Sequence, residues 1–154
     1  MKNKIAIILL IAWLGSAPMA LSHLDSTAFY QSYRQSLLAL LGANFGPMES
    51  MLKGEMPWNE TMFIHWSEDL ARVAQLDIMR GFPAGSDTGR TRAKSTIWDN
   101  IDDFESKIAD LRRETTLMAE VAANGNKQAF LKQFQITGGT CKACHDEYKS
   151  KKYL

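Results

Sequence analysis

The pentapeptide CKACH, residues 141 to 145, carries the side chains of this sequence that are most capable of covalent or metal chemistry. Cys141 and Cys144 are the only two cysteines among 154 residues, and His145 is one of three histidines. Two thiols at this spacing could form a redox dithiol, a disulfide or half of a zinc site, and the histidine adds c-type haem attachment. In haem attachment, both thiols bond to the porphyrin and the imidazole ligates the iron.

Helical geometry favours haem attachment over the other three. On a helix, Cys144 lies about 60° to one side of Cys141 and His145 about 40° to the other, so all three share the apolar face of their segment. A thioredoxin-like dithiol is expected near the start of a helix in a βαβ unit, whereas this motif comes late in a helical segment. Zinc would require further ligands, and His23 and His65 are the only other histidines. A simple disulfide stays open as a less favoured alternative.

The chain begins with the features of a secretory signal peptide. Two lysines precede an apolar run, residues 5–14, that is too short to span a membrane comfortably. Residues 20–22, Ala-Leu-Ser, fit a cleavage site. We therefore expect residues 1–22 to be removed and residues 23–154 to form the mature domain. An uncleaved anchor is less favoured, because a glycine and a proline soon follow the short run.

Export to the periplasm agrees with the rest of the composition. Two neighbouring cysteines in an oxidising compartment are expected to have a covalent partner. Removal of the two N-terminal lysines lowers the formal net charge from +1 to about −1, which gives no basic footprint for nucleic acid. With no second apolar span in the sequence, we expect the mature protein to be soluble and to lack a membrane span.

Four segments with apolar residues every three or four positions are expected to position the motif. They cover residues 26–53, 57–79, 95–124 and 126 onward to the basic tail. A loop rich in Gly, Ser, Asp and Arg, residues 81–94, separates the second from the third. Four amphipathic helices with mostly short links predict an all-α fold, an antiparallel four-helix bundle, here with a covalently bound haem c.

The fourth segment contains a pair of glycines that weakens it as a helix. Gly138 and Gly139 stand in its interior, and each costs about 1 kcal/mol relative to alanine. Glycines at these positions indicate that a bulky group approaches the backbone there.

Three stretches of the chain resemble the cytochrome c′ family of class II c-type cytochromes. They are YRQSLLALLGANFGPM (33–48), STIWDN (95–100) and CKACHDEYKSKK (141–152), and the similarity covers essentially the whole mature chain in the same order. The C-terminal haem motif is the most specific, because most other cytochromes c carry it near the N-terminus. The resemblance implies a pentacoordinate, high-spin haem inside a four-helix bundle.

The resemblance also implies roles for particular residues. His145 is the proximal ligand of the iron, Arg34 pairs with a haem propionate, and Leu38 blocks the distal face from the first helix. Lys149 lies near the proximal face, where some relatives have arginine, and lysine keeps the charge but lacks the planar guanidinium. Independently of the resemblance, Tyr148 is expected to pack on the haem edge with its hydroxyl bonded to a partner. Taken alone, Arg34 could be a solvated surface residue and Leu38 a plain core leucine.

These roles predict a protein that binds small diatomic gases, chiefly nitric oxide and carbon monoxide. An apolar side chain opposite His145 offers no hydrogen bond to bound O₂ and adds a steric cost for any sixth ligand. The alternative is a low-spin electron-transfer carrier of the class II type, which needs a sixth protein ligand. No methionine lies between residues 20 and 47 to supply one from the first helix. An enzyme is not expected, because no acid–base constellation accompanies the motif.

Two protein partners are expected besides the gas ligands. One is a redox partner protein that exchanges electrons with the haem. The other is a second copy of the chain, because the resemblance implies a homodimer through the first two helices. Leu40, Met51 and Met62, outside the main apolar stripe, are the candidate contact residues.

Overall fold

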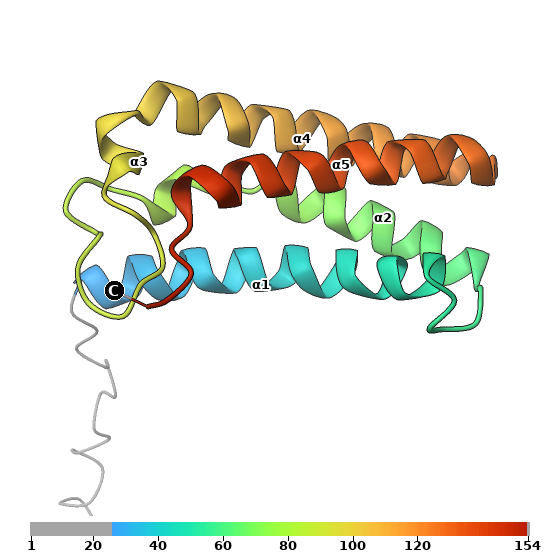
Figure 1. The fold of residues 1–154 in the computed structure, drawn as a ribbon, viewed down its shortest axis with the longest axis horizontal. Helices are drawn as coiled ribbons and strands as arrows, with labels where there is room; N and C mark the ends of the chain where they lie inside the picture. Colours follow the sequence, from blue (N-terminus) through green and yellow to red (C-terminus); the bar gives the residue numbers. More distant parts are fainter. Residues whose placement is uncertain (1–25, 154) are drawn as a thin grey trace, which may run out of the picture.

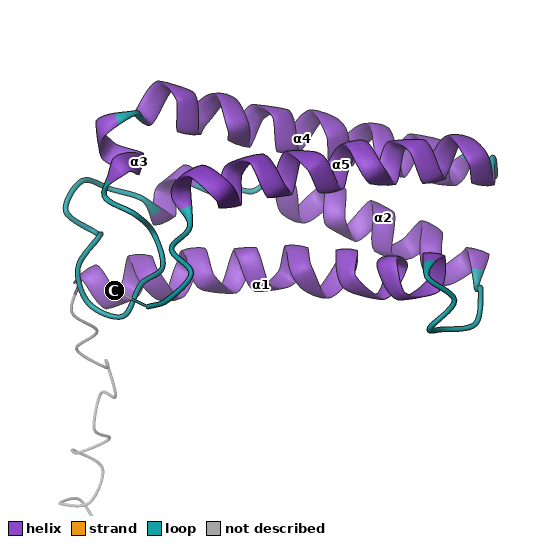
Figure 2. Ribbon diagram, viewed as in Figure 1, coloured by secondary structure: helices purple, strands orange, loops and turns teal. Residues whose placement is uncertain are grey.

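The computed structural model describes residues 26–153, which form an antiparallel bundle of four long helices (Figure 1). In chain order the elements are α1 (Ser26–Leu52), α2 (Glu60–Ala74), η1 (Met79–Gly81), α3 (Thr96–Asp99), α4 (Ile101–Ala123) and α5 (Lys127–Tyr148). Loops make up the rest of the described chain (Figure 2), and its one β-type pairing is an isolated bridge between Ala93 and Lys149. The predicted all-α bundle is thus confirmed. No helix within these residues is long and apolar enough to cross a membrane.

The second helix is shorter than the sequence predicts at both ends. It begins at Glu60 and not at Pro57, because Asn59 takes an extended conformation and its side chain accepts a hydrogen bond from the backbone N–H of Met62. It ends at Ala74, and the chain passes through the short helix η1 before entering the loop of residues 81–94.

The third predicted helix is in fact two helices separated at Asn100. The backbone there has φ −133° and ψ 47°, outside the helical region, so α3 is a single turn and α4 starts at Ile101. The Asn100 amide group donates to the carbonyl of Thr96 at 3.1 Å, which satisfies the end of α3. Asparagine often competes with helix in this way, because its short side chain can bond to nearby backbone.

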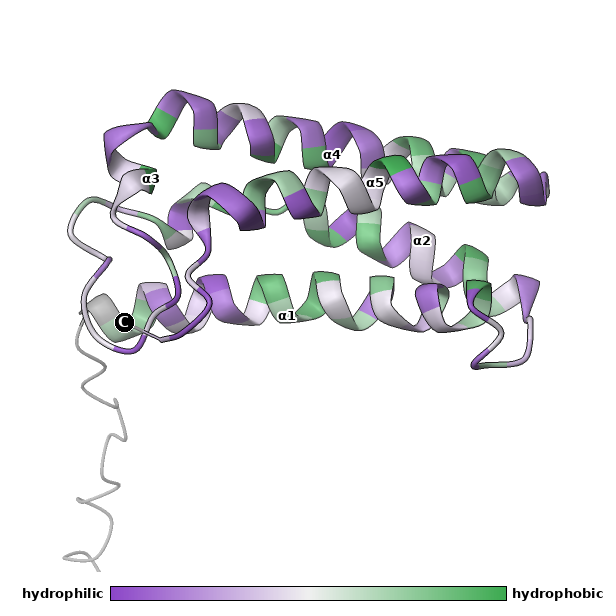
Figure 3. Cartoon of the chain, in the orientation of Figure 1, coloured by the Kyte–Doolittle hydropathy of each residue, from purple (hydrophilic) through white to green (hydrophobic). Residues whose placement is uncertain are grey.

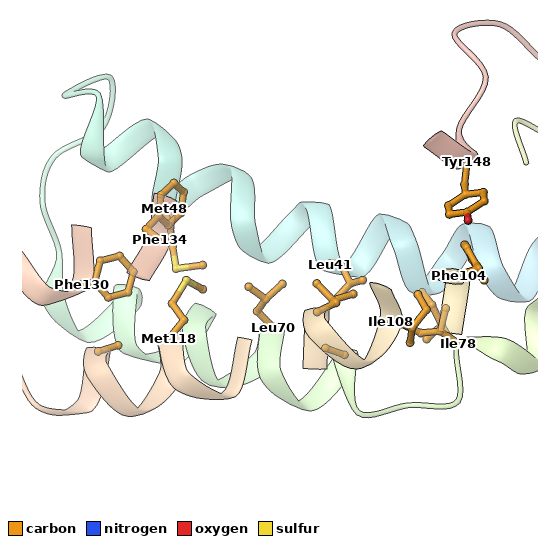
Figure 4. Packing of buried hydrophobic residues seen from close by; sticks show 14 of the residues in the cluster. Leu41, Met48, Leu70, Ile78, Phe104, Ile108, Met118, Phe130, Phe134 and Tyr148 are labelled. Carbon is orange, nitrogen blue, oxygen red and sulfur yellow. The ribbon is translucent and has the colours of Figure 1, made fainter. Parts of the chain in front are cut away.

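The core lies where the apolar stripes of the helices meet (Figure 3). Figure 4 shows that Met48, Phe130, Phe134 and Met118 gather at one end of the bundle. The rings of Phe63 and Phe130 meet edge to face with centroids 4.0 Å apart. We call this the aromatic end. The opposite end, where the loop of residues 81–94 meets the last turn of α5, we call the loop end.

The leucine and two methionines expected to form a dimer contact differ in how exposed they are. Leu40 on α1 is 49% exposed and Met62 on α2 is 38% exposed. Met51 is only 7% exposed and belongs to the core, so its assignment to an outer surface was wrong. Met51 follows the fully buried Met48 by three residues, so both side chains lie on the inner face of α1.

Candidate haem site

The CKACH motif occupies the next-to-last turns of α5, as the sequence predicts. Cys141 and Cys144 are partly buried and pack against the core cluster. His145 is exposed and lines an open cavity of about 490 Å³, so the expectation that it points into the core together with the two thiols was wrong. The other residues that line this cavity are Arg92, Lys94, Asp146, Lys149, Ser150 and Lys151.

The surroundings set the protonation of these three side chains. Burial raises the pKa of the Cys141 thiol, and it raises the pKa of Cys144 to about 11, so both thiols are protonated at neutral pH. Partial desolvation lowers the pKa of His145, and the positive charges of Lys149 and Arg92 lower it further. A lowered pKa favours the neutral imidazole, which is the form with a lone pair for a metal ion.

A stacked pair of phenylalanines fixes how α1 and α5 face each other. The rings of Phe45 and Phe134 are nearly parallel, with centroids 4.2 Å apart. A β-carbon placed on Gly138 would lie 3.4 Å from the ring of Phe45, so glycine gives this ring room against the backbone. Phe45 is therefore the bulky group that approaches the backbone at Gly138. Gly139 has open space instead and nothing in contact.

The same register places Leu38 across from the thiols. Leu38 precedes Phe45 by seven residues and Cys141 follows Phe134 by seven, and seven residues are two turns of helix. Because α1 and α5 run in opposite directions (Figure 1), these steps lead the same way along the bundle, so Leu38 and Cys141 lie at a similar level along its axis. Leu38 is 40% exposed although its neighbour Leu37 is buried, so the reading of Leu38 as a plain core leucine was wrong.

These residues fit a covalently held haem. Two thiols and an imidazole lie within the last turns of α5, and an apolar side chain lies at a similar level on α1. Close backbone contact is extensive between α1 and α2, between α2 and α4 and between α4 and α5, but among the described residues it is not extensive between α1 and α5. Cys141 and Cys144 would bond to the porphyrin and His145 would ligate the iron, so α1 and α5 form the two walls of the site.

Comparison with known proteins decides the family. The model of the family described as Cytochrome C' matches residues 30–149. The chain belongs to the cytochrome c′ family. A solved cytochrome c prime from Shewanella frigidimarina is 34% identical with a TM-score of 0.79, and the match covers 82% of this chain and 98% of the other. The cofactor is accordingly haem c, and the dithiol and zinc alternatives are set aside.

Two further solved relatives carry information on ligands and assembly. One is a nitric oxide complex of a mutant cytochrome c prime from Alcaligenes xylosoxidans, 27% identical with a TM-score of 0.74 over 83% of this chain and 98% of that one. The other is a cytochrome c′ described as having an unusual ligand-controlled dimer dissociation. It is 25% identical with a TM-score of 0.76 and is matched over 98% of its length and 82% of this chain.

Arg34, one helical turn before Leu38, is among the most buried polar residues of this cytochrome c′. It is only 2% exposed, so the alternative of a solvated surface arginine was wrong. Its two terminal nitrogens donate to the carbonyl and hydroxyl oxygens of Ser86, to the carbonyl of Gly81 and to the hydroxyl of Thr91, at 2.7 to 2.9 Å. Burial lowers the pKa of its guanidinium, and Asp87 opposes that shift. Its pairing with a propionate stays a prediction. The Nε–H of Arg34 makes no hydrogen bond within the described residues, so it is the donor left for such a pairing.

Tyr148 and Lys149 close the site beyond the haem motif. Tyr148 is buried, with its ring edge-on to Phe104, and its hydroxyl donates to the carboxylate of Asp103. This bond raises the pKa of Tyr148 to about 12 and lowers the pKa of Asp103. The expected partner for the hydroxyl is thus present, while contact of the ring with a haem edge stays a prediction. Lys149 is exposed and its backbone pairs with Ala93.

The sequence-based reasoning missed the residues of the loop that contact the site. Ser86 and Thr91 accept hydrogen bonds from Arg34, and the ammonium group of Lys94 donates a hydrogen bond to the last turn of α5. The composition of residues 81–94 is that of an ordinary solvated loop, so the pattern gave no sign of these contacts. The one available signal was the buried arginine, which requires acceptors from somewhere in the chain.

Proposed function

We propose that this cytochrome c′ holds a pentacoordinate, high-spin haem with His145 as its single protein ligand, and that it binds nitric oxide and carbon monoxide. The observation that carries the proposal is the placement of Leu38 at the level of the thiols on the opposite wall. A leucine has no donor atom, so this wall offers the iron hydrocarbon and no sixth ligand.

The methionines of α1 lie far from Leu38. Met48 and Met51 are the methionines of α1 that the structure describes, and both are buried toward the aromatic end. Ten residues of helix separate Met48 from Leu38, which is about 15 Å. His65 is exposed on α2, although Phe63 and Ser67 on either side of it are buried.

The chain's own residues would control which gas reaches the iron. Haem iron supplies reversible coordination of a diatomic ligand and one-electron redox chemistry. Leu38 occupies the approach, so a ligand must displace its side chain, and it donates no hydrogen bond that would favour polar, bound O₂. His145 holds the opposite side, and the ease with which its bond lengthens sets the second part of the selectivity. The nitric oxide complex of the relative from Alcaligenes xylosoxidans supports this reading.

Export and dimer formation complete the proposal. We place the mature protein, residues 23–154, in the periplasm on the basis of the N-terminal sequence, which lies outside the described residues. A homodimer through α1 and α2 would cover the exposed apolar side chains Leu40 and Met62. The ligand-controlled dimer of one relative supports this assembly. We propose a binder and electron carrier and no enzymatic activity.

The second candidate is a low-spin electron carrier. The basic cavity beside His145 favours it, because Arg92, Lys94, Lys149 and Lys151 would attract an acidic redox partner. Electron paramagnetic resonance of the oxidised holoprotein separates the two candidates. A high-spin iron signal is expected from a single imidazole ligand, and a low-spin signal from the wild-type protein would reject pentacoordination and favour the carrier.

A further inference from the structure

We propose that Lys94 is a positioning residue for His145, acting through the last turn of α5. This inference rests on the proposed function in one respect, namely that His145 ligates the iron. The hydrogen bonds that support it are independent of that role and join the loop of residues 81–94 to the backbone that directly follows the histidine.

Lys94 occupies the C-terminal end of α5 with both its side chain and its backbone. The ammonium group donates to the carbonyls of Asp146 at 3.1 Å and Glu147 at 2.7 Å. The backbone N–H of Lys94 donates to the carbonyl of Tyr148 at 3.0 Å. The last carbonyls of a helix lack partners within the helix and carry its partial negative charge, so a cation is favoured there. Lys94 therefore satisfies the three consecutive carbonyls that come immediately after His145.

The residues on either side of this contact hold the chain in the same place. Arg92 and Ser150 form two hydrogen bonds with each other, both at 2.7 Å. The backbone N–H of Ser150 donates to the Arg92 carbonyl, and the Arg92 Nε–H donates to the Ser150 carbonyl. The bridge between Ala93 and Lys149 lies between them. The carbonyl of His145 itself accepts from the N–H of Lys149 at 3.1 Å. The turn that carries His145 is thus bonded to the loop over several consecutive residues.

The loop is fastened on its other side to α1. Arg34 donates to Ser86 and to the hydroxyl of Thr91, and that hydroxyl accepts from the N–H of Ala93 at 3.1 Å. A continuous path of hydrogen bonds therefore runs from the wall that presents Leu38 to the turn that presents His145. Bonds to the backbone of the turn that carries a ligand limit how far that ligand can move, as outer hydrogen bonds to the ligand itself do. Without Lys94, the end of α5 would be free to shift, and the imidazole would bind the iron less firmly.

The test compares Lys94→Met with Lys151→Met in the haem-loaded, reduced protein. Both variants remove a cation from the cavity beside His145, but the Lys151 side chain donates no hydrogen bond within the part of the chain that the structure describes. Resonance Raman spectroscopy measures the iron–histidine stretching frequency, and hydrogen exchange measures the amides of residues 146–150. We expect Lys94→Met to lower the frequency and to speed exchange about tenfold, as loss of roughly 1.4 kcal/mol would. Lys151→Met should change neither, and Lys94→Arg should restore most of both.

Two outcomes would overturn the inference. An unchanged stretching frequency in Lys94→Met, with faster exchange, would make Lys94 a helix cap with no influence on the histidine. Equal frequency changes in both lysine variants would assign the effect to charge alone. A low-spin wild-type protein would instead reject the proposed function. The inference would then be tested by the haem-methyl proton shifts, which report the orientation of the imidazole. These shifts should differ between the Lys94→Met and Lys151→Met variants.

Discussion

The two ends of the bundle differ in the polar contacts that join their elements. At the aromatic end, Phe45, Phe63, Phe130 and Phe134 pack ring against ring around Met48, and apolar contact supplies the stability. At the loop end, the rings of Phe82, Phe104 and Tyr148 also pack edge to face, and Arg34 and Lys94 add hydrogen bonds to backbone carbonyls of the loop and of α5. An apolar side chain, Leu38, stays partly exposed there.

The difference shows how a small bundle can keep one part closed and another part accessible. The stacked rings of Phe45 and Phe134 bring α1 and α5 into contact. Glycine at position 138 allows this contact beside Phe45, while two turns away the walls are fixed by a loop bonded to both of them. The aromatic end therefore acts as the structural base, and the loop end determines the shape of the cofactor site.

The largest effect is expected from removal of both thiols. Cys141→Ala combined with Cys144→Ala should abolish covalent haem attachment, because these are the only two cysteines of the chain. Mass spectrometry of the denatured protein should then give the mass of the polypeptide without porphyrin. A matched change at the aromatic end, Phe130→Ala, should leave the covalent haem in place. Covalently retained porphyrin in the double variant would contradict the assignment of the motif.

Phe130→Ala tests the structural role of the aromatic end. The side chain is 2% exposed and packs against Phe63 and Phe134, so its loss should lower the free energy of unfolding by about 3–5 kcal/mol. Chemical denaturation of the holoprotein measures this change, and carbon monoxide association should stay at the wild-type rate. Phe29→Ala, at a position 40% exposed, serves as the control and should cost far less. A large change in association rate for Phe130→Ala would remove the distinction between the two ends.

Arg34→Met tests the loop end in the same terms. The change removes the donor for three acceptor residues of the loop and should cost about 2–3 kcal/mol of unfolding free energy. Limited proteolysis should in addition cut the variant within residues 81–94 faster than Phe130→Ala, because the loop alone is released. Equal protease sensitivity of the two variants would show that the arginine does not hold the loop.

Leu38→Ala tests access to the iron and not stability. Truncation of this partly exposed side chain should speed carbon monoxide association with the reduced protein about tenfold, equivalent to roughly 1.4 kcal/mol of barrier. Flash photolysis or stopped flow gives the rate. Leu40→Ala, two residues along the same helix and more exposed, is the control and should not change it. An unchanged rate in Leu38→Ala would mean that this leucine does not guard the site.

The smallest effect concerns the bond between Tyr148 and Asp103. Asp103→Asn should lower the pKa of Tyr148 from about 12 toward its ordinary value of 10.0, since the carboxylate bond is the main cause of the shift. Because the pKa of Tyr148 is raised in the folded state, the bond stabilises the folded protein below about pH 10. This stabilisation is lost as the pH rises through about 12. Ultraviolet titration of the tyrosines should therefore show one group titrating earlier in the variant. Asp102→Asn is the control, and an identical effect from it would argue against the specific bond.

The sequence predicts the helices and the haem motif well because both depend on local spacing. Ile97, Phe104 and Met118 are buried as their periodicity indicates, and Asn124-Gly125 ends α4 with Gly125 at φ +67°. The break at Asn100 could not be predicted, since asparagine fits both a helix interior and its end.

The long-range polar contacts at the loop end could not be predicted either. Arg34 and Ser86 are 52 positions apart, and Lys94 and Asp146 also 52, so no periodic pattern relates them. Such contacts depend on where a loop comes to lie after the helices have packed. The same holds for His145, whose angle on the helix places it beside the thiols but does not say how much of the ring is covered.

We propose that one imidazole holds the iron on one side and that hydrocarbon faces it on the other. The absorption spectrum of the reduced protein, recorded with and without carbon monoxide, tests it most directly. We expect a high-spin Soret band that shifts sharply when the gas is added. A sharp low-spin α-band that does not respond to carbon monoxide would contradict it.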